Sequence, residues 1–279
     1  MSLNPVTPVS PAAGYLGGKR NLAKRVCAIL QSVDHDGYAE PFVGMGGIFF
    51  RRAHRPRVEV INDISGDVTA LFRVVRRHYR ALVDELDWLP ASRDDFMRMR
   101  AIDPACLTDI ERAARFLYLQ RLAFGGKIVG RHFGVDKSAP ARFNLARLRA
   151  VLAAIRDRLQ PVVIEQLPYG DFIRRYDRPG MLFYLDPPYW NCEGDYGADV
   201  FDRGDFERLA EQLRGIRGKF LLSINDTPEI RAIFASFSMK EVGVTYTISA
   251  AATGNGQRVG ELLVANFALD GAAGSSAPG

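Results

Sequence analysis

Cysteine is scarce in this sequence: only Cys27, Cys106 and Cys192 occur among 279 residues. Three thiols this far apart exclude a disulfide framework as the source of stability, and they fit the reducing cytoplasm, where we expect the protein to act. The four histidines and three cysteines also lack the spacing of zinc ligands, so we expect no bound metal.

Long apolar runs are absent as well. No segment reaches the roughly 18 apolar residues that a membrane helix requires, so we expect no membrane partner. The N-terminal stretch MSLNPVTPVSPAAG lacks both the charged region and the apolar region of a secretory signal. We expect the Pro-rich residues 1–13 to be a disordered lead, and residues 270–279 (DGAAGSSAPG) to be a disordered tail.

Short β-rich runs alternate with helical patterns along the chain, without internal repeats or coiled-coil heptads. Several runs are almost entirely apolar, as expected for strands that are covered on both faces. The pattern predicts an α/β protein with a mostly parallel, doubly wound sheet. The predicted strands are residues 38–42, 57–61, 162–166, 181–186, 220–224 and 262–267.

Helix signals lie between these runs. Apolar residues recur at helical spacing over residues 68–82 and 145–159. Thr108 and Glu111 have the spacing of a capping box at the start of another helix. Pro228 suits the first turn of a helix that is capped by one of the two residues before it.

One region breaks the alternation: residues 76–159 show helical patterns and loops but no convincing strand. We interpret it as a mainly helical insertion into an α/β domain formed by residues 14–75 and 160–269. Its centre, residues 112–150, holds nine Lys or Arg and one acid, a local charge of +8, whereas the whole chain carries only +5. Such a concentration is typical of a surface that meets a polyanion, although an Arg-rich solvated helix face has the same composition.

A glycine-rich turn follows the first predicted strand in the stretch GYAEPFVGMGGIFF, residues 37–50. Glycines let the backbone turn sharply and approach a ligand, and we expect a helix to start directly behind them. Asp63 follows the second strand, where a carboxylate can accept both hydroxyl groups of a ribose. These features predict a nucleoside cofactor; a tight turn beside a surface aspartate is the alternative.

The turn does not match the GxGxxG pattern of dinucleotide-binding loops, because GIF follows the GMG of residues 44–46. A pyrophosphate cradle and a nicotinamide-dependent oxidoreductase are therefore disfavoured. S-adenosylmethionine has a ribose but no phosphate, so the loop that binds it does not need to form a phosphate-binding site. Upstream, Lys19 in the stretch YLGGK can meet a cofactor carboxylate with Tyr15 beside it, or can be a lone surface charge.

The stretch FYLDPPYW, residues 183–190, ends a predicted buried strand with an acid, a rigid turn and an aromatic ring. Ligands sit beyond the carboxyl ends of the strands in a doubly wound sheet, which places Asp186 at the candidate site. Pro187 and Pro188 fix φ, so the carbonyl groups of the turn point in set directions. Asp186 and the Pro187 carbonyl can accept the two N–H groups of a nucleobase amine, while Tyr189 stacks on the base.

Such a clamp suits methyl transfer to an exocyclic amine. Two acceptors localise the nitrogen lone pair, which can then attack an activated methyl group without a strong base. A base inside a duplex is out of reach, so it must first be flipped out of the stack. Methylation at cytosine C5 needs an activated cysteine, and Cys192 lies in a polar stretch with nothing visible to activate it.

Together and in this order, the motifs resemble those of the Dam-like DNA adenine-N6 methyltransferases over residues 14–267. The five matching stretches are YLGGK, AEPFVGMGG, IND, FYLDPPYW and FLLSINDTPEIRAIF. The resemblance implies a Rossmann-like methyltransferase fold, S-adenosylmethionine as cofactor and double-stranded DNA as partner. The implied cofactor-binding residues are Tyr15, Lys19, Glu40, Pro41, Phe42, Gly44, Gly46, Asp63, Asp171 and Asp186. The implied catalytic residues are Asp186, Pro187, Pro188 and Tyr189.

The insertion would recognise the DNA target by this resemblance. Here it reads QRLAFGGKIVGRHFGV and lacks the aromatic–asparagine pattern of the members that recognise GATC, so GATC is not assigned to this chain. His132 suits a structural or phosphate-facing role as well as it suits base recognition. The DNA-binding candidates are Arg121, Phe124, Lys127, Arg131, His132, Lys137 and Arg142.

Two alternatives to adenine methylation stay open. Cytosine-N4 methylation uses a similar clamp, although by resemblance its enzymes more often carry serine where Asp186 stands. A non-catalytic DNA-binding module with a vestigial cofactor fold is the other alternative, against which the intact Lys19, Asp63 and Asp186 argue. A cognate restriction enzyme is a candidate partner, and a monomer is favoured. Host regulation, restriction–modification and phage self-protection all fit as biological roles.

Overall fold

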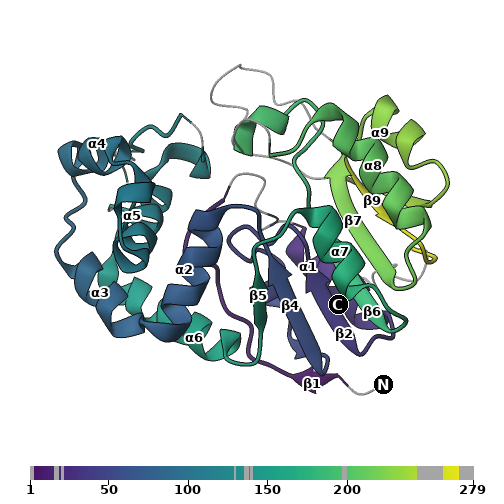
Figure 1. Cartoon of the computed structure of the whole chain (residues 1–279), viewed down its shortest axis with the longest axis horizontal. Coiled ribbons are helices and arrows are strands. Elements are labelled where there is room, and N and C mark those ends of the chain that lie inside the picture. Colours follow the sequence, from purple (N-terminus) through teal and green to yellow (C-terminus); the bar gives the residue numbers. More distant parts are fainter. Residues whose placement is uncertain are drawn as a thin grey trace, which may run out of the picture.

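The computed structural model describes residues 3–15, 19, 22–128, 130–134, 138, 141–196, 200–243 and 260–269. Within them, seven strands form one sheet with the order β5-β4-β2-β6-β7-β9-β8 (Figure 1). The first five strands in this order are parallel, as predicted, whereas β9 is antiparallel to both of its neighbours. The strands are β2 (Gly37–Glu40), β4 (Val58–Asn62), β5 (Val163–Glu165), β6 (Met181–Leu185), β7 (Lys219–Asn225), β8 (Ser238–Gly243) and β9 (Gly260–Ala265).

Side chains of the central strands alternate between two apolar layers. On β6, Leu182 and Tyr184 belong to one layer, whereas Phe183 and Leu185 belong to the other. All four are buried, and burial of one such side chain contributes about 1.5–3 kcal/mol. The first layer includes α1 (Ala23–Ser32), α2 (Gly66–Arg77) and α6 (Leu145–Leu159), and the second includes α7 (Tyr169–Tyr176), α8 (Arg203–Arg214) and α9 (Pro228–Ile233).

Local sequence signals predicted much of this architecture. All six predicted strands occur, each within two residues of its expected ends. Thr108 caps α5 (Asp109–Leu122) in a full capping box with Glu111. Thr227 caps α9, which has Pro228 in its first turn. β8 was not predicted, because its edge-strand sequence SMKEVG mixes exposed and half-buried residues without an apolar run.

The prediction of a helix directly behind the glycine turn is wrong. Residues 44–48 form a turn that is followed only by the short 3-10 helix η1 (Phe49–Arg51). Arg52 is extended, and the chain then enters β3 (His54–Arg55), which pairs with β1 (Asn4–Pro5). This antiparallel pairing draws the chain away from helical geometry after a single turn.

The prediction that residues 1–13 form a disordered lead is wrong for residues 3–13. Beyond the pairing of β1 with β3, the amide of Val6 donates a hydrogen bond to Ala53 O at 2.8 Å. These backbone bonds hold the Pro-rich segment against the body of the protein. The expected disordered tail, residues 270–279, lies outside the described residues.

The predicted insertion, residues 76–159, contains α3 (Tyr79–Asp87), α4 (Arg93–Ala101), α5 and α6, and its described residues include no strand of the sheet. The helices α3, α4 and α5 lie beside the sheet, on the outer side of α2 (Figure 1), whereas α6 packs in the first apolar layer. His78 separates α2 from α3, so the continuous periodicity over residues 68–82 belongs to two helices. The insertion also has a small apolar cluster of its own: Phe96, Tyr118, Leu119 and Leu122. In the described part of the chain, no helix has both the length and the apolar character needed to cross a membrane.

Candidate active site

A cavity of about 1080 Å³ lies at the carboxyl ends of β2, β4 and β6. This is the edge of the sheet where a doubly wound fold binds its ligands. Ten residues of the sequence-based prediction line it: Tyr15, Lys19, Glu40, Pro41, Phe42, Gly44, Asp63, Asp186 and Pro188 from the cofactor and catalytic sets, and Arg121 from the DNA-binding set. The glycine turn, the acid after the second strand and two residues of the DPPY turn therefore share one cavity, whereas Pro187 and Tyr189 are not among its lining residues.

Asp63 is held at the cavity wall by two backbone amides. Gly44 N donates to Asp63 Oδ2 and Ser65 N donates to Asp63 Oδ1, both at 2.9 Å. Burial raises the pKa of Asp63 to about 6, and the two amides oppose that rise. Because a carboxylate has about four acceptor positions, Asp63 can still accept hydrogen bonds from a ligand.

Gly44 must be glycine for this arrangement. Its φ is +49°, and a Cβ at this position would lie 2.9 Å from the ring of Tyr15. A side chain would thus strain the backbone and displace the aromatic ring beside it. Gly46 also has a positive φ, but a Cβ there would meet the ring of Phe50, and Gly46 does not line the cavity. The glycine turn therefore shapes the cavity through Gly44 rather than through Gly46.

Asn62 connects three walls of the cavity and was not predicted. Its Nδ2 donates to Pro41 O at 2.9 Å and to Leu167 O at 3.0 Å, and its Oδ1 accepts from Leu167 N at 2.8 Å. These bonds join the end of β4 to the segment after β2 and to the segment before α7. The position next to Asp63 was the only sequence signal for such a role.

An aromatic wall forms another part of the cavity. The rings of Phe42, Tyr169 and Phe201 have centroid separations of 5.5, 6.0 and 5.7 Å. The Tyr169 hydroxyl donates to Asp205 Oδ1 at 2.8 Å, which fixes its ring. Ile64, next to Asp63, adds an apolar side chain that is 41% exposed. A flat aromatic base fits such a wall, and only Phe42 of these residues was predicted.

Asp186 belongs to a buried cluster of charged groups. The ammonium of Lys19 lies 2.9 Å from Asp186 Oδ1 and 2.7 Å from Glu261 Oε1. The Tyr189 hydroxyl contacts the same ammonium and donates to Glu261 Oε1 at 2.5 Å. Burial raises the pKa of Asp186 to about 6, while Lys19 opposes that rise and Glu261 adds to it. Glu261 was not predicted, because nothing near it in the sequence marks it as part of the site.

The DPPY turn is braced from the neighbouring strand. Asn225, at the end of β7, accepts a hydrogen bond from Trp190 N at 2.8 Å and donates to Trp190 O at 3.0 Å. Ser223, two residues earlier, donates to Asp186 Oδ1 at 3.4 Å and exchanges a 2.7 Å hydrogen bond with the Tyr184 hydroxyl. The turn and its acid are therefore fixed from β7 as well as from β6.

Glu40 is the third acid of the cavity wall. It is 2% exposed and accepts a hydrogen bond from the Tyr38 hydroxyl at 2.5 Å. Burial raises the pKa of Glu40 to about 8, so the side chain is mainly protonated at neutral pH. A neutral carboxyl group can donate one hydrogen bond, which a carboxylate cannot.

Asp171 does not reach the cavity. It lies in the first turn of α7, its side chain is 52% exposed, and it pairs with Arg174 on the same helix. The helix presents Asp171 to solvent, and Tyr169 takes the place on the cavity wall. The structure therefore gives no support to the predicted contact between Asp171 and a cofactor.

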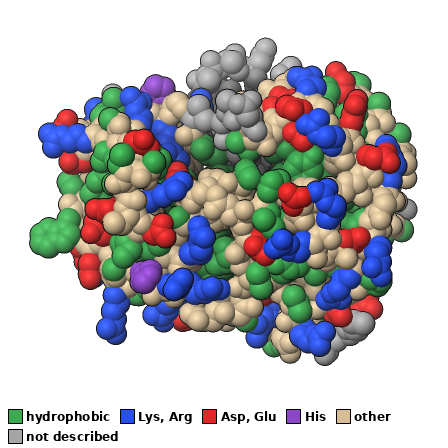
Figure 2. Space-filling model, viewed as in Figure 1, with side chains coloured by type: hydrophobic (Ala, Val, Ile, Leu, Met, Phe, Trp, Pro, Cys, Tyr) green, Lys and Arg blue, Asp and Glu red, His purple; other side chains and the backbone are tan. Residues whose placement is uncertain are grey.

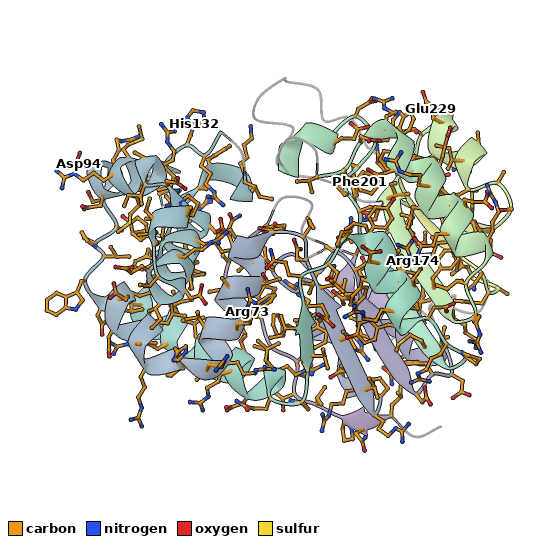
Figure 3. All side chains as sticks on the ribbon, in the orientation of Figure 1. Arg73, Asp94, His132, Arg174, Phe201 and Glu229 are labelled. Carbon is orange, nitrogen blue, oxygen red and sulfur yellow. The ribbon has the colours of Figure 1, made fainter. Side chains whose placement is uncertain are left out.

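Some of the DNA-binding candidates are accessible and others are not. Figure 2 shows Lys and Arg side chains on the insertion side of the face in view, with some acidic side chains among them. In Figure 3, His132 lies at the top of the insertion, and Phe201 lies on the part of the molecule across from it. The exposed candidates are Phe124, Lys127, His132 and Arg142.

Arg131 is buried within the protein, whereas Arg121 lies at the wall of the cavity. Arg131 is 8% exposed and donates from Nη2 to Gln120 Oε1 and from Nε to Lys127 O, both at 3.2 Å. Arg121 is half-buried and donates from Nη1 to Ala12 O at 3.2 Å. Both predictions of direct DNA contact lack support, because composition does not show whether an Arg side chain is buried. Lys137 lies outside the described residues.

The family model described as D12 class N6 adenine-specific DNA methyltransferase matches residues 15–248. The type II methyltransferase M1.LlaDCHI of Lactococcus lactis subsp. cremoris is 24% identical over 275 residues, 92% of this chain and 95% of that protein. The type II methyltransferase M.CviBI of Paramecium bursaria Chlorella virus NC1A is 23% identical, over 85% of this chain and 91% of its own. Among solved structures, precorrin 8W decarboxylase from Methanobacterium thermoautotrophicum has a TM-score of 0.42 and 8% identity, covering 94% of this chain and 100% of its own.

Proposed function

Because the chain belongs to the D12 class of N6 adenine-specific DNA methyltransferases, we propose that it methylates N6 of an adenine that is flipped out of duplex DNA. The methyl donor is S-adenosylmethionine. One observation carries the assignment of the site: Asp63 and Asp186 line the same cavity, one suited to a ribose and the other to an amine. Cytosine-N4 methylation, the alternative with a similar clamp, is not favoured by this family.

The chemistry of the cavity wall fits S-adenosylmethionine. Bound there, the cofactor supplies a methyl group on a positively charged sulfur, which keeps the electrons of the broken C–S bond. Asp63 accepts the ribose hydroxyls, and the aromatic wall formed by Phe42, Tyr169 and Phe201 packs against the adenine ring. We assign the methionine end to three further polar residues of the lining, Tyr15, Lys19 and Glu40.

The DPPY turn then acts on the target base. The lone pair of an adenine amine is delocalised into the ring, which makes the amine a poor nucleophile. Asp186 and the carbonyl of Pro187 accept its two N–H bonds, which localises the lone pair on nitrogen. The carboxylate also stabilises the positive charge that develops on N6, and it can take up the proton that N6 releases. Fixed acceptors in a buried site do this without reorganisation, which is the main source of rate enhancement here.

Tyr189 stacks on the flipped base in this proposal. Stacking on an aromatic side chain contributes about 1–3 kcal/mol per base, whereas removal of a base from the duplex costs a few kcal/mol. Phosphate contacts from exposed side chains of the insertion, Lys127 and Arg142 among them, supply further binding energy. The hydroxyl of Tyr189 is held by Glu261 and Lys19, so its ring is fixed before the base arrives.

Two finer features belong to the same proposal. We infer that the protein works as a monomer, because all five motifs expected of the site, from YLGGK to FLLSINDTPEIRAIF, belong to this chain. We also infer a cognate restriction enzyme as partner, on the ground that both relatives are named type II methyltransferases. Sequencing of modified bases in DNA from cells that express the gene would give the recognition sequence, which that partner would have to share.

Product analysis tests the proposed reaction. Duplex DNA is incubated with methyl-labelled S-adenosylmethionine and digested to nucleosides, with Asp186→Asn as the inactive control. We expect label in N6-methyladenine from the wild-type enzyme alone. Label only in N4-methylcytosine, or no label in any base, would overturn the proposal.

A further inference from the structure

Glu261 connects the last strand of the sheet to the proposed amine clamp. It lies on β9, beyond the residues 15–248 that the family model matches, and it does not line the cavity. Its Oε1 nevertheless lies 2.7 Å from the Lys19 ammonium and accepts the Tyr189 hydroxyl at 2.5 Å. We propose that Glu261 is a positioning residue for methyl transfer, which shares Lys19 with Asp186 and fixes the ring of Tyr189.

The position of Glu261 in the fold argues for a specific role. The residues that follow it on β9, Leu262 to Ala265, are buried and apolar, and the Glu261 side chain itself is 1% exposed. A buried carboxylate is strongly unfavourable unless hydrogen bonds and an opposite charge compensate it. Lys19 and Tyr189 provide both kinds of compensation, and both belong to motifs of the proposed site.

Sharing of Lys19 makes Asp186 a better acceptor. One ammonium serves two carboxylates at 2.9 and 2.7 Å, so neither carboxylate is neutralised by it alone. If Lys19 were paired with Asp186 only, its charge would draw electron density from the oxygens that must accept the adenine amine. Glu261 thus keeps Asp186 strong enough as an acceptor for the reaction, because its negative charge offsets part of the field of Lys19.

The groups that face Asp186 come from each element packed around it. They are Lys19 of the N-terminal segment, Glu40 of β2, Tyr184 of β6, Ser223 of β7 and Glu261 of β9. Burial raises the pKa of Glu40 to about 8 and that of Tyr184 well above its usual value, so both are mainly neutral at neutral pH. The ion pairs that act on Asp186 are therefore those of Lys19 with Asp186 and with Glu261. Removal of the Glu261 charge should therefore change the pKa of Asp186 directly.

The turn after β6 is held at two points by neighbouring strands. Glu261 lies opposite Asn225 in the β7–β9 ladder. Asn225 holds the backbone of Trp190, and Glu261 holds the hydroxyl of Tyr189, the residue before it. An antiparallel β9 between β7 and β8 brings both side chains to the same end of the sheet.

Glu261→Gln tests the inference, with Glu241→Gln on the adjacent β8 as the matched control, because the Glu241 side chain is 66% exposed. We expect kcat of Glu261→Gln to fall by about tenfold or more, as small misplacements of reacting groups do, with less change in KM for DNA. We also expect the acid limb of its kcat–pH profile to move to lower pH, since Lys19 then pairs with Asp186 alone. Glu241→Gln should match the wild type in both respects.

Tyr189→Phe provides a second measurement that does not alter a buried charge. If Glu261 acts partly through the Tyr189 hydroxyl, Tyr189→Phe should lower kcat, and the double variant should lose less than the product of the two single losses. If Glu261→Gln does not fold, a wild-type kcat for Tyr189→Phe overturns the inference and a reduced kcat supports it.

The inference rests on the proposed function, and the two can fail separately. If the wild-type enzyme forms no N6-methyladenine, the proposed function itself is wrong. If the wild-type enzyme forms N6-methyladenine, and Glu261→Gln has an unchanged kcat and an unmoved acid limb of the kcat–pH profile, only the proposed role of Glu261 is wrong.

Discussion

The Lys19 ammonium lies 2.9 Å from Asp186 Oδ1, although the two residues belong to the N-terminal segment and to the end of β6. The contact brings the first and fourth motifs of the sequence into one site. Because the carboxylate is only 24% exposed, its charge depends on this neighbour as well as on pH. The charge state of Asp186 is therefore the natural starting point for experiments.

Turnover should fall at acid pH as Asp186 becomes protonated. Its pKa is raised to about 6, so the carboxylate that accepts the adenine amine is lost as pH falls through that value. Single-turnover rates measured from about pH 5 to pH 8 should show this acid limb. Asp186→Asn should abolish turnover but keep most of the salt-dependent DNA binding, which phosphate contacts dominate. A flat profile over this range would contradict the assigned role of the carboxylate.

Cofactor affinity should depend on Asp63 and not on Asp171. Asp63→Asn should raise the Kd for S-adenosylmethionine about tenfold or more, because hydrogen bonds to a charged group contribute about 1.5–3 kcal/mol. The new amide would also face the N–H groups of Gly44 and Ser65, which now donate to the carboxylate. Asp171→Asn, at an exposed position of α7, should bind S-adenosylmethionine with the same Kd as the wild type. Isothermal titration calorimetry distinguishes the two; equal effects would place Asp171 at the cofactor after all.

Stability should decrease between pH 6 and pH 8 because of Glu40. Its pKa is about 8 in the folded protein, above the ordinary value of 4.5, so folding retains a proton that the unfolded chain has released. The free energy of unfolding should therefore fall as pH rises through this window, by at most about 1.4 kcal/mol per pH unit. Glu40→Gln should flatten that slope in chemical denaturation experiments.

Glu229→Gln is the control for this measurement, since Glu229 lies at an exposed position of α9 (Figure 3). Its slope between pH 6 and pH 8 should equal that of the wild type. A Glu40→Gln variant with an unaltered slope would show that Glu40 is ionised in the folded protein.

Alanine substitutions at two basic residues of the insertion should affect different properties, stability in one case and DNA binding in the other. Arg131→Ala should lower the free energy of unfolding by about 1–3 kcal/mol, because it leaves the buried Gln120 Oε1 without this donor. Lys127→Ala, at an exposed position, should leave stability within about 0.5 kcal/mol of the wild type. It should instead weaken DNA binding for all sequences alike and reduce the salt slope by about 1. Fluorescence anisotropy at several salt concentrations, with thermal unfolding in parallel, measures both effects; unaltered DNA binding by Lys127→Ala would exclude a phosphate contact.

Local sequence patterns were sufficient to predict six of the seven strands of the sheet, two helix caps and the residues at the strand ends. Those features depend on near neighbours in the chain: the two-residue alternation of β6, the capping box of Thr108, and Asp63 and Asp186 directly after their strands. Since parallel strands present their carboxyl ends at one edge, the meeting of both acids in a cavity followed from the predicted topology.

Which charged groups act on one another depends on the three-dimensional packing of the chain. Glu261 reaches Lys19 and Tyr189 because β9 inserts antiparallel between β7 and β8, an ordering that no local pattern encodes. The same holds for Arg131, whose burial depends on the packing of the insertion, and for Asp171, which the orientation of α7 turns toward solvent. A charge has its effect through distance and burial, and both are set by contacts between segments far apart in the chain.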